Sequence, residues 1–323
     1  MLAICCPGQG SQSPGFLRPW LELPGVPERL DAFSQAAGVD LRLHGTESDA
    51  DTIRDTAVAQ PLIVAASLIA LRALLGDTPP ADVAGVTAGH SVGEIAAAAV
   101  AGVLDDVGAV GLVSHRARSM AGAAAATPTG MSAVVGGEPE AVLAAIEAAG
   151  LYPANVNGGG QVVAAGSLEN LAGLPEHVPP RTRVIPLQVA GAFHTPYMQS
   201  AFEEFASVAA DWPANDVLLP LLSDADGAAH RSRGGSGHGR GRDVLRRLAE
   251  QVVAPVRWDL CQQTMVEMGV TTMIELAPAG VLTGLAKRAM PGVRAVALST
   301  PDDLETAAEL LRSTPTTNEE TPA

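Results

Sequence analysis

Hydrophobic positions along this chain fall into two kinds of pattern, short apolar runs and longer stretches with helical spacing. Residues 2–8 (LAICCPG) and 81–90 (ADVAGVTAGH) are short apolar runs, and they predict buried strands. Residues 55–76 carry apolar side chains at helical spacing, so we expect a helix that begins near Pro61 and ends at Gly76. Two more helices are expected over residues 91–104 and 105–124. Strands that alternate with helices predict an α/β domain with a largely parallel sheet.

The pattern changes between residues 129 and 189, where shorter strands and helices follow each other in the order βαββαβ. The expected elements are strands at 130–137, 152–158, 160–166 and 181–189, with helices at 138–150 and 167–178. This order is that of a ferredoxin-like unit. Because α/β patterning resumes afterwards, we expect a small domain (129–189) inserted into a discontinuous large domain (1–128 and 190–311).

Two segments lack any hydrophobic periodicity. Residues 227–242 (GAAHRSRGGSGHGRGR) are rich in Gly and Arg, and we expect them to form a mobile loop. Residues 312–323 (RSTPTTNEETPA) are polar and contain Pro and Thr, which predicts a disordered tail.

Length and charge exclude some classes of protein. The chain has 323 residues, which suits a large domain with a smaller one attached, and 47% hydrophobic residues allow a sizeable core. A net charge of -15 argues against a general nucleic-acid binder, which needs a basic face. The apolar run that contains Arg72 is expected to fall short of a bilayer span. The N-terminal sequence has no basic region before its apolar run, so we expect no signal peptide.

The cysteines give no sign of a metal site or of disulfides. Cys5, Cys6 and Cys261 have neither metal-ligand spacing nor an even number. We therefore expect buried thiols, no metal, and a soluble cytoplasmic protein without membrane contact.

The clearest chemical signal is the stretch TAGHSVGEIA at 87–96, in which residues 89–93 match the pattern G-x-S-x-G. The match follows an expected strand and opens an expected helix, which is the context that a nucleophile elbow requires. Ser91 is therefore a candidate nucleophile, and a purely structural glycine-rich turn is the alternative. The N–H of Val92, at the helix N-terminus, is a candidate oxyanion donor.

A nucleophilic serine needs a base, and we select it by elimination among seven histidines. His90 adjoins Ser91, but the next residue of such a turn points elsewhere. His194 lies just past the last strand of the inserted unit, where the two domains meet and a cleft is expected. The other histidines lie in polar, loop or mid-helix contexts. His194 is thus the best candidate for the base, with a structural loop histidine as the alternative.

Five motifs occur in a fixed order: PGQGSQ at 7–12, GHSVGE at 89–94, GAFHTPYM at 191–198, PVRW at 255–258 and GVLTGLAKR at 280–288. Together they resemble the malonyl-CoA:acyl carrier protein transacylase family of bacterial fatty acid and polyketide synthesis. The resemblance covers residues 2–311, nearly the whole chain. It implies an α/β-hydrolase-like domain that carries a ferredoxin-like insert, in agreement with the pattern of elements.

The resemblance also implies roles for individual residues at the reacting centre. Ser91 matches the family nucleophile and His194 matches its base. Gln9 matches a residue that helps to form the oxyanion hole with the N–H of Val92. No acidic residue stands out as a third member of a triad. The resemblance instead implies that a backbone carbonyl, at the place of Gln251, orients the histidine.

Further matches concern the acyl group. Arg116 matches the arginine that holds the malonyl carboxylate, and a guanidinium is suited to this because it binds a carboxylate in two parallel hydrogen bonds. Arg118 should point away on the same helix. Phe193 matches a bulky position that goes with malonyl rather than methylmalonyl in related domains, because its ring fills the space of an α-methyl group. Gln60 and Gln161 match polar residues that line the cleft.

The activity implied is ping-pong transfer of malonyl from malonyl-CoA to the phosphopantetheine thiol of an acyl carrier protein. It implies an O-malonyl-serine intermediate, a monomeric enzyme, and no cofactor beyond the CoA thioester. Carrier proteins are acidic, so a basic patch should help the encounter with this acidic enzyme. The densest basic cluster, which could steer the carrier or be a solvated loop, is Arg231, Arg233, Arg240, Arg242, Arg246 and Arg247.

Three alternatives remain at this stage. One is an acyl thioesterase or editing hydrolase on the same scaffold, and Arg116 argues against an uncharged acyl substrate. Another is a transferase that moves a different acyl group between carrier proteins. A third is a non-catalytic module, which would require the loss of Ser91, His194 or Gln9, yet all three are present.

Overall fold

The computed structural model describes residues 1–231 and 240–314, which form two sheets with helices packed around them. The larger sheet has six strands in the order β10-β9-β1-β2-β7-β8. Every pair in it is parallel except β7 with β8, at one edge. Its strands are β1 (Leu2–Cys6), β2 (Val86–Gly89), β7 (Leu221–Leu222), β8 (Ala229–His230), β9 (Thr272–Glu275) and β10 (Arg294–Ala297).

Helices cover both faces of this sheet, as a buried parallel sheet requires. The helices outside the smaller unit are α1 (Val26–Ala37), α2 (Leu41–Thr46), α3 (Thr56–Leu75), α4 (Gly93–Val100), α5 (Asp106–Ala126), α8 (Gln199–Asp211), α9 (Arg240–Glu250), α10 (Trp258–Glu267), α11 (Val281–Ala289) and α12 (Leu304–Ser313). Side chains of β1 alternate between the faces. Ile4 packs with α3, α4 and α5, whereas Ala3 and Cys5 pack with α10 and α11. The class predicted from the sequence, an α/β fold with a second smaller unit, is confirmed.

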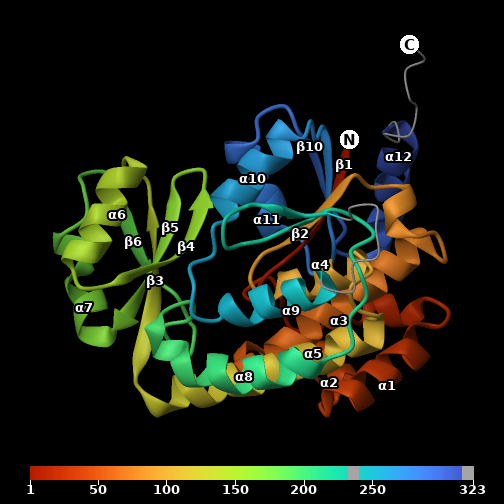
Figure 1. Ribbon diagram of the computed structural model, residues 1–323, viewed down its shortest axis with the longest axis horizontal. Coiled ribbons are helices and arrows are strands. Elements are labelled where there is room, and N and C mark those ends of the chain that lie inside the picture. Colours follow the sequence, from red (N-terminus) through yellow and green to blue (C-terminus); the bar gives the residue numbers. More distant parts are fainter. Residues whose placement is uncertain (232–239, 315–323) are drawn as a thin grey trace.

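The smaller unit is a four-stranded antiparallel sheet in the order β4-β5-β3-β6. Its elements are β3 (Thr129–Val135), α6 (Pro139–Ala148), β4 (Tyr152–Gly158), β5 (Gln161–Ser167), α7 (Leu168–Gly173) and β6 (Arg183–Pro186). This is the βαββαβ order expected from the pattern, and the unit lies to the left of the larger one in Figure 1. The exact domain limits (1–128 with 190–311, and 129–189) stay predictions.

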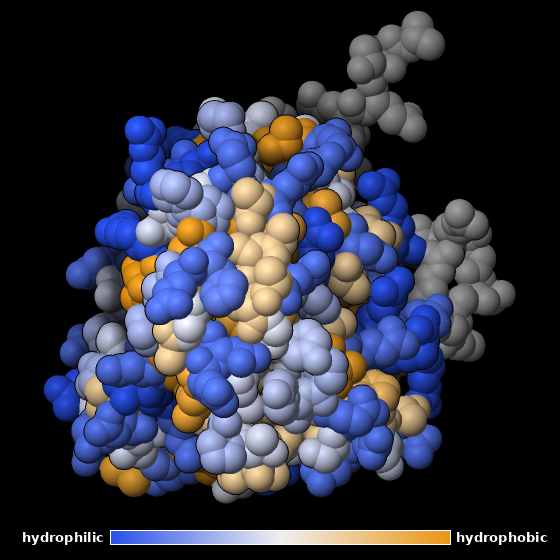
Figure 2. Space-filling view, turned by 90° about the vertical axis from the view of Figure 1, so that its left-hand side faces the viewer, coloured by the Kyte–Doolittle hydropathy of each residue, from blue (hydrophilic) through white to orange (hydrophobic). Residues whose placement is uncertain are grey.

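The two units touch through backbone as well as side chains. Val256, just before α10, exchanges hydrogen bonds with β4, accepting from the Val156 N–H at 2.8 Å and donating to the Ala154 carbonyl at 2.9 Å. On its outer side the smaller unit carries hydrophilic residues interspersed with hydrophobic ones (Figure 2). The exposed large hydrophobic residues of this unit are Tyr152, Leu168, Ile185 and Leu187.

Helix α3 differs from the expectation in where it begins. It starts at Thr56 rather than near Pro61, because the Asp55 side chain caps it by accepting from the Ala57 N–H at 2.7 Å. Pro61 therefore lies inside the helix. The expected shortfall in length was also wrong: by length and composition alone, this 20-residue helix could cross a membrane. Within the structure, however, 78% of its apolar window is buried, so it serves as a core helix.

Two segments expected to lack structure are ordered in part. The stretch 227–242 contributes β8 at its start and the first turn of α9 at its end, and residues 232–239 lie outside the described part. The stretch 312–323 begins inside α12, and the Thr314 hydroxyl contacts that of Thr272 at 3.0 Å. Residues 315–323 lie outside the described part. These expectations were wrong at the segment ends, because tertiary contacts order polar residues that show no periodicity.

Cys5, Cys6 and Cys261 are buried and unpaired, as expected. Burial raises the pKa of each thiol. A thiol held protonated in this way is a poor nucleophile, so these cysteines fill the core.

Candidate active site

Ser91 occupies a sharp turn at the carboxyl end of β2, directly before α4. Its φ of 53° lies in the left-handed region, which is strained for a residue with a side chain. The flanking glycines allow this turn, because the chain approaches itself closely there. A Cβ on Gly89 would lie 2.0 Å from the carbonyl carbon of Gly93, and one on Gly93 would lie 2.2 Å from the Cys6 carbonyl oxygen. The structure therefore has the nucleophile-elbow geometry at this motif.

His194 faces the serine. Its Nε2 lies 2.8 Å from Ser91 Oγ, and its Nδ1 lies 2.9 Å from the carbonyl oxygen of Gln251. Because a carbonyl can only accept, Nδ1 carries the proton and Nε2 is free to accept one from the serine. His194 is 4% exposed, and burial, aided by the charge of Arg116, lowers its pKa to about 3. The imidazole is therefore neutral at physiological pH, as a base must be.

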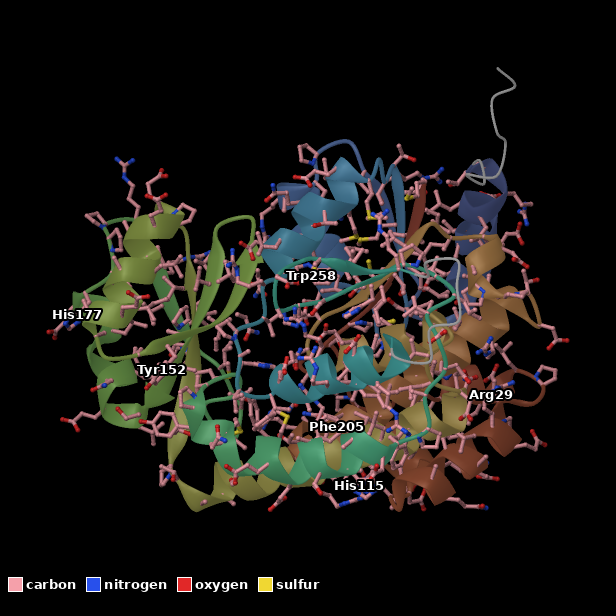
Figure 3. The ribbon with its side chains drawn as sticks, viewed as in Figure 1. Arg29, His115, Tyr152, His177, Phe205 and Trp258 are labelled. Carbon is pink, nitrogen blue, oxygen red and sulfur yellow. The ribbon has the colours of Figure 1, made fainter. Side chains whose placement is uncertain are left out.

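The other described histidines that we considered do not contact Ser91 Oγ. His90 Nε2 bonds to Asn157 Oδ1 at 2.8 Å, and its ring lies 5.8 Å from that of Trp258, which Figure 3 labels. His115 packs against Trp212 on the side of α5. His177 lies at the outer edge of the smaller unit (Figure 3). The choice of His194 by elimination therefore agrees with the geometry.

Arg116 extends from α5 into the same site and is 1% exposed. Its Nη1 donates to Gln60 Oε1 at 2.8 Å, and its Nη2 donates to Gln251 Oε1 at 2.7 Å and to Ser91 Oγ at 3.2 Å. Burial lowers its pKa to about 10, so the guanidinium is still charged at neutral pH. All three acceptors are neutral, and no carboxylate of the described residues forms an ion pair with it. Glu94 and Asp224 act on this cation only from a distance. A buried cation with no carboxylate in direct contact favours an anionic ligand beside the serine.

Arg118, two residues on, lies on a different face of the helix and bonds to the carbonyl of Ala37 at 3.3 Å. Gln60, which the resemblance placed in the cleft, is 2% exposed and also contacts Met120 Sδ at 3.5 Å. Its role in the structure is to hold the guanidinium of Arg116. The orientation of that guanidinium is thus set by two glutamine oxygens.

The two residues expected to form the oxyanion hole differ in their hydrogen bonds. Val92 is the N-cap of α4, and its N–H donates to no acceptor within the described part of the chain. It is therefore available to an oxyanion. Gln9 points its amide at the carbonyl of Arg54 and the hydroxyl of Thr56, each at 3.4 Å. These contacts are long, and within the described part of the chain no hydrogen bond joins Gln9 to Ser91.

Phe193 directly precedes the base and is 6% exposed, packed in the main core. Gln161 lies further away. Its Oε1 accepts from Asn157 Nδ2 at 2.9 Å, and Asn157 in turn bonds to His90. Gln161 is therefore linked to the elbow through two intermediate side chains and does not touch Ser91.

The sequence analysis missed two buried acids behind the nucleophile. Asp224 is 0% exposed, and its Oδ2 accepts from the Ser91 N–H at 2.6 Å and from Gln251 Nε2 at 3.1 Å. Glu94 is 4% exposed and accepts from the Asp224 N–H at 2.8 Å. Glu94 lies inside the GHSVGE motif, and Asp224 follows β7 at the carboxyl edge of the sheet. That edge, where α/β folds bind ligands, was the signal that could have found Asp224.

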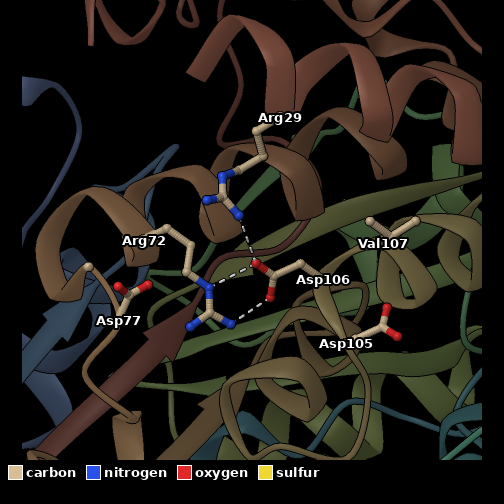
Figure 4. A pocket seen from close by; sticks show the side chains of 7 residues that line it. Arg29, Arg72, Asp77, Asp105, Asp106 and Val107 are labelled. Carbon is tan, nitrogen blue, oxygen red and sulfur yellow. Dashed lines mark hydrogen bonds and ion pairs between the residues drawn. The ribbon is translucent and has the colours of Figure 1, made fainter. Parts of the chain in front are cut away.

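A separate pocket of about 560 Å³ lies between α1, α3 and α5. Its two arginines, Arg29 and Arg72, both contact Asp106, at 3.4 Å and at 2.7 Å (Figure 4). Asp77 and Asp105 also line this pocket, so its acids outnumber its two arginines. An anion would therefore bind less favourably there than beside Arg116.

Known proteins are similar to this chain over nearly its full length. The family model described as acyl transferase domain matches residues 4–306. The malonyl CoA-acyl carrier protein transacylase of Mycobacterium tuberculosis strain H37Rv is 47% identical over 310 residues, 96% of this chain and 100% of the relative. The enzyme of that name from Escherichia coli K12 is 32% identical and covers 95% of this chain and 99% of the relative.

Solved structures give the same result. The crystal structure of MCAT from Mycobacterium tuberculosis superposes with a TM-score of 0.87 at 46% identity, covering 95% of this chain and 99% of that one. A malonyl-transacylase solved in complex with a type II polyketide synthase acyl-carrier protein gives 0.86 at 28% identity, with 95% and 99% coverage. With family model, relatives and structures in agreement over nearly its full length, the chain belongs to the malonyl-CoA:acyl carrier protein transacylase family.

Proposed function

We propose that this protein moves a malonyl group from malonyl-CoA to the phosphopantetheine thiol of an acyl carrier protein, through an O-malonyl ester on Ser91. One observation carries the proposal: Ser91 Oγ lies 2.8 Å from a neutral His194 Nε2 and 3.2 Å from the buried guanidinium of Arg116, which no carboxylate of the described residues contacts. The first contact supplies an activated nucleophile. The second supplies a site for a carboxylate at the distance where a malonyl group would place one.

In the first half-reaction, Ser91 Oγ attacks the thioester carbonyl while its proton passes to His194 Nε2. The Val92 N–H, at the N-terminus of α4, stabilises the oxyanion of the tetrahedral intermediate, and Gln9 is the second proposed donor. Each such donor is worth about 3 kcal/mol to the transition state. When the C–S bond breaks, His194 returns the proton to the leaving CoA thiolate. The carrier-protein thiol then reverses these steps and receives the malonyl group.

The substrate carboxylate also acts on the base. The pKa of His194 is low first because it is buried and second because Arg116 lies close by. A carboxylate paired with Arg116 would cancel the second effect and raise the pKa of His194 towards its ordinary value. A stronger base accepts the serine proton more readily. Malonyl binding would thereby favour its own transfer, whereas an acetyl group would not.

Phe193 is the residue proposed to set the preference for malonyl over methylmalonyl, because its buried ring is next to the base in sequence. A second side chain on the α-carbon would need space at that position. The product, a malonyl carrier protein, is an extender unit for fatty acid or polyketide synthesis.

The arginine cluster is proposed to steer the carrier protein, and its charge is partly compensated. Arg247 lies 3.2 Å from Asp226, and Arg246 lies 2.8 Å from Glu250. Arg231 is exposed, Arg233 lies outside the described residues, and of Arg240 the structure describes only the backbone. Replacing Arg231, Arg233, Arg240, Arg242, Arg246 and Arg247 by Ser should weaken the apparent affinity for carrier protein without changing loading from malonyl-CoA. An unchanged affinity would contradict the steering role.

We further propose a cytoplasmic monomer that requires no metal and no cofactor beyond its CoA thioester. Loading should then survive dialysis against EDTA, and sedimentation should give a single species near 32.8 kDa.

The decisive experiment is intact-mass analysis after brief mixing with malonyl-CoA, acetyl-CoA or methylmalonyl-CoA. The wild type should gain one malonyl group and discharge it onto a carrier protein. Ser91→Ala should gain none, Arg116→Ala should lose selectivity for malonyl, and Arg118→Ala is the matched control. An adduct that forms only from acetyl-CoA, or one that is lost rapidly to water, would instead favour an editing hydrolase.

A further inference from the structure

Gln251 connects the base to the carboxylate site. Its backbone carbonyl accepts from His194 Nδ1 at 2.9 Å, and its side-chain Oε1 accepts from Arg116 Nη2 at 2.7 Å. The other polar group of its side chain, Nε2, donates to Asp224 Oδ2 at 3.1 Å. Gln251, directly after α9, thus fixes both the imidazole of His194 and the guanidinium of Arg116. Its side chain can accept from Arg116 and donate to Asp224 only in one of its two amide orientations.

Asp224 determines which orientation that is. A carboxylate only accepts hydrogen bonds, so the group of Gln251 that faces it must be the NH₂. The amide oxygen must then face Arg116, whose guanidinium only donates. If Asp224 could donate instead, the amide could turn over and present its NH₂ to Arg116, which would repel it. The carboxylate of Asp224 therefore makes the position of Arg116 unambiguous.

The same carboxylate oxygen also holds the nucleophile. Asp224 Oδ2 accepts the Ser91 N–H at 2.6 Å, a short charge-assisted bond to a residue in the strained left-handed region. The backbone of Asp224 is itself fixed, because its N–H donates to Glu94 and its carbonyl accepts from the Arg257 N–H at 2.7 Å. The acid is thus a rigid support for the serine and, through Gln251, for the guanidinium.

We propose that Asp224 is a positioning residue of the acyl transfer site, which orients Gln251, and through it Arg116, while it holds the Ser91 N–H. The inference rests on the proposed malonyl transfer, because it concerns the alignment of the malonyl carboxylate with the nucleophile. Asp224 touches no substrate atom, so it acts only through these neighbours.

The charged and titratable groups around Asp224 and its neighbour Glu94 come from several packed elements: His90, Arg116, Arg247 and Cys261. Burial raises the pKa of Asp224 to about 6 and raises that of Glu94 well above its usual range. Two buried acids so close together do not both ionise readily. Asp224 has the more favourable hydrogen bonds for an anion, because its Oδ2 accepts from the Ser91 N–H and from Gln251 Nε2. Among the described residues, Glu94 accepts through Oε1 from the Asp224 N–H, and its Oε2 accepts from none. At neutral pH the proton therefore stays on Glu94, and Asp224 remains an acceptor.

The test compares Asp224→Leu, which has no acceptor, with Asp224→Asn, which keeps an acceptor oxygen. The Ser91 N–H can only donate, so it should hold that oxygen at the place of Oδ2, where Gln251 Nε2 also donates. Single-turnover loading of Ser91 from malonyl-CoA and from acetyl-CoA is followed by intact mass, and the ratio of the two rates is the main readout. A variant that only lowers the folded fraction slows both acyl groups equally and leaves the ratio unchanged. Asp226→Asn is the control, since it removes an acid two residues away whose side chain is at the surface.

We expect Asp224→Leu to slow malonyl loading by about 100-fold, the scale that misplacement of reacting groups costs. The malonyl:acetyl ratio should fall with it, because acetyl does not need Arg116. Asp224→Asn should restore malonyl loading to within about tenfold of the wild type and recover most of the ratio. An Asp224→Leu enzyme with the wild-type ratio, or an Asn variant that rescues nothing while folded, would overturn the inference.

A second variant covers the case in which Asp224→Leu does not fold. Gln251→Met keeps the backbone carbonyl for His194 but removes the link between Asp224 and Arg116. It should lower the malonyl:acetyl ratio in the same way, and an unchanged ratio would contradict the inference.

A wild type that forms no malonyl adduct on Ser91 would refute the proposed function itself. A wild type that loads normally beside variants with the same ratio would refute only the role of Asp224.

Discussion

Ser91 and His194 meet with 2.8 Å between Oγ and Nε2, and both adopt positive φ, 53° and 61°. Each residue is thus held in a backbone conformation that side chains disfavour by roughly 1–2 kcal/mol. The surrounding contacts maintain both, since Asp224 holds the Ser91 N–H and Gln251 holds the imidazole. The reacting pair is therefore aligned before substrate arrives.

This strain predicts a difference between two inactive variants. Ser91→Gly removes the nucleophile but also relieves the left-handed conformation, whereas Ser91→Ala removes the nucleophile and keeps the strain. We expect neither variant to be malonylated, and Ser91→Gly to be more stable than Ser91→Ala by about 1 kcal/mol. Urea denaturation of the two proteins measures this difference. Equal stabilities would mean that the turn is not strained.

His194 predicts a pH dependence of stability. Its pKa falls from 6.5 to about 3 on folding, so between these values the unfolded chain binds more protons. The stability that the neutral His194 contributes to the folded state is then fully present above pH 6.5 and is lost as the pH falls towards 3. The slope is at most about 1.4 kcal/mol per pH unit, which gives about 2 kcal/mol between pH 6.5 and 5.

The measurement is the free energy of unfolding of wild type and His194→Gln at pH 7 and pH 5. The raised pKa of Asp224 makes its contribution to stability grow on acidification, in the wild type and in the variant alike. Only the difference between the two proteins therefore reports His194. The wild type should lose more stability on acidification than the variant does. Parallel losses would show that His194 is not buried in its neutral form.

Gln60 predicts a selective loss of malonyl loading. Gln60→Leu would remove an acceptor from the buried guanidinium of Arg116, at a cost of about 1–3 kcal/mol. We expect malonyl loading to slow by about tenfold or more, with acetyl loading changed less. Gln161→Leu is the matched control, because Gln161 reaches the elbow only through Asn157 and His90. Equal effects of the two variants would contradict the role of Gln60.

Local and non-local features of this site differed in how well the sequence predicted them. Ser91 could be found because its signal is local: glycines, serine and the strand-to-helix change lie within ten residues. Asp224 could not, because it meets Ser91 across 133 positions of sequence. Likewise, Pro61 marked an apparent helix start, while the true start depended on the single side-chain cap of Asp55. The ends of polar segments, such as Thr314, became ordered through contacts with β9 that no periodicity records.

Phe193 predicts how the acyl preference can be changed. Its ring is 6% exposed and belongs to the main core, so truncation to Ala would cost about 3–5 kcal/mol and could unfold the protein. Phe193→Leu removes part of the ring volume at a smaller cost, and it leaves the contacts of His194 in place. We expect the ratio of methylmalonyl to malonyl loading to rise several-fold, mainly because methylmalonyl is admitted rather than because malonyl is lost. Competition between the two CoA thioesters, read by intact mass, measures the ratio directly. Phe205→Leu, on α8 and 0% exposed, is the control for a general loosening of the core, and a similar rise in that variant would show that Phe193 does not set the preference.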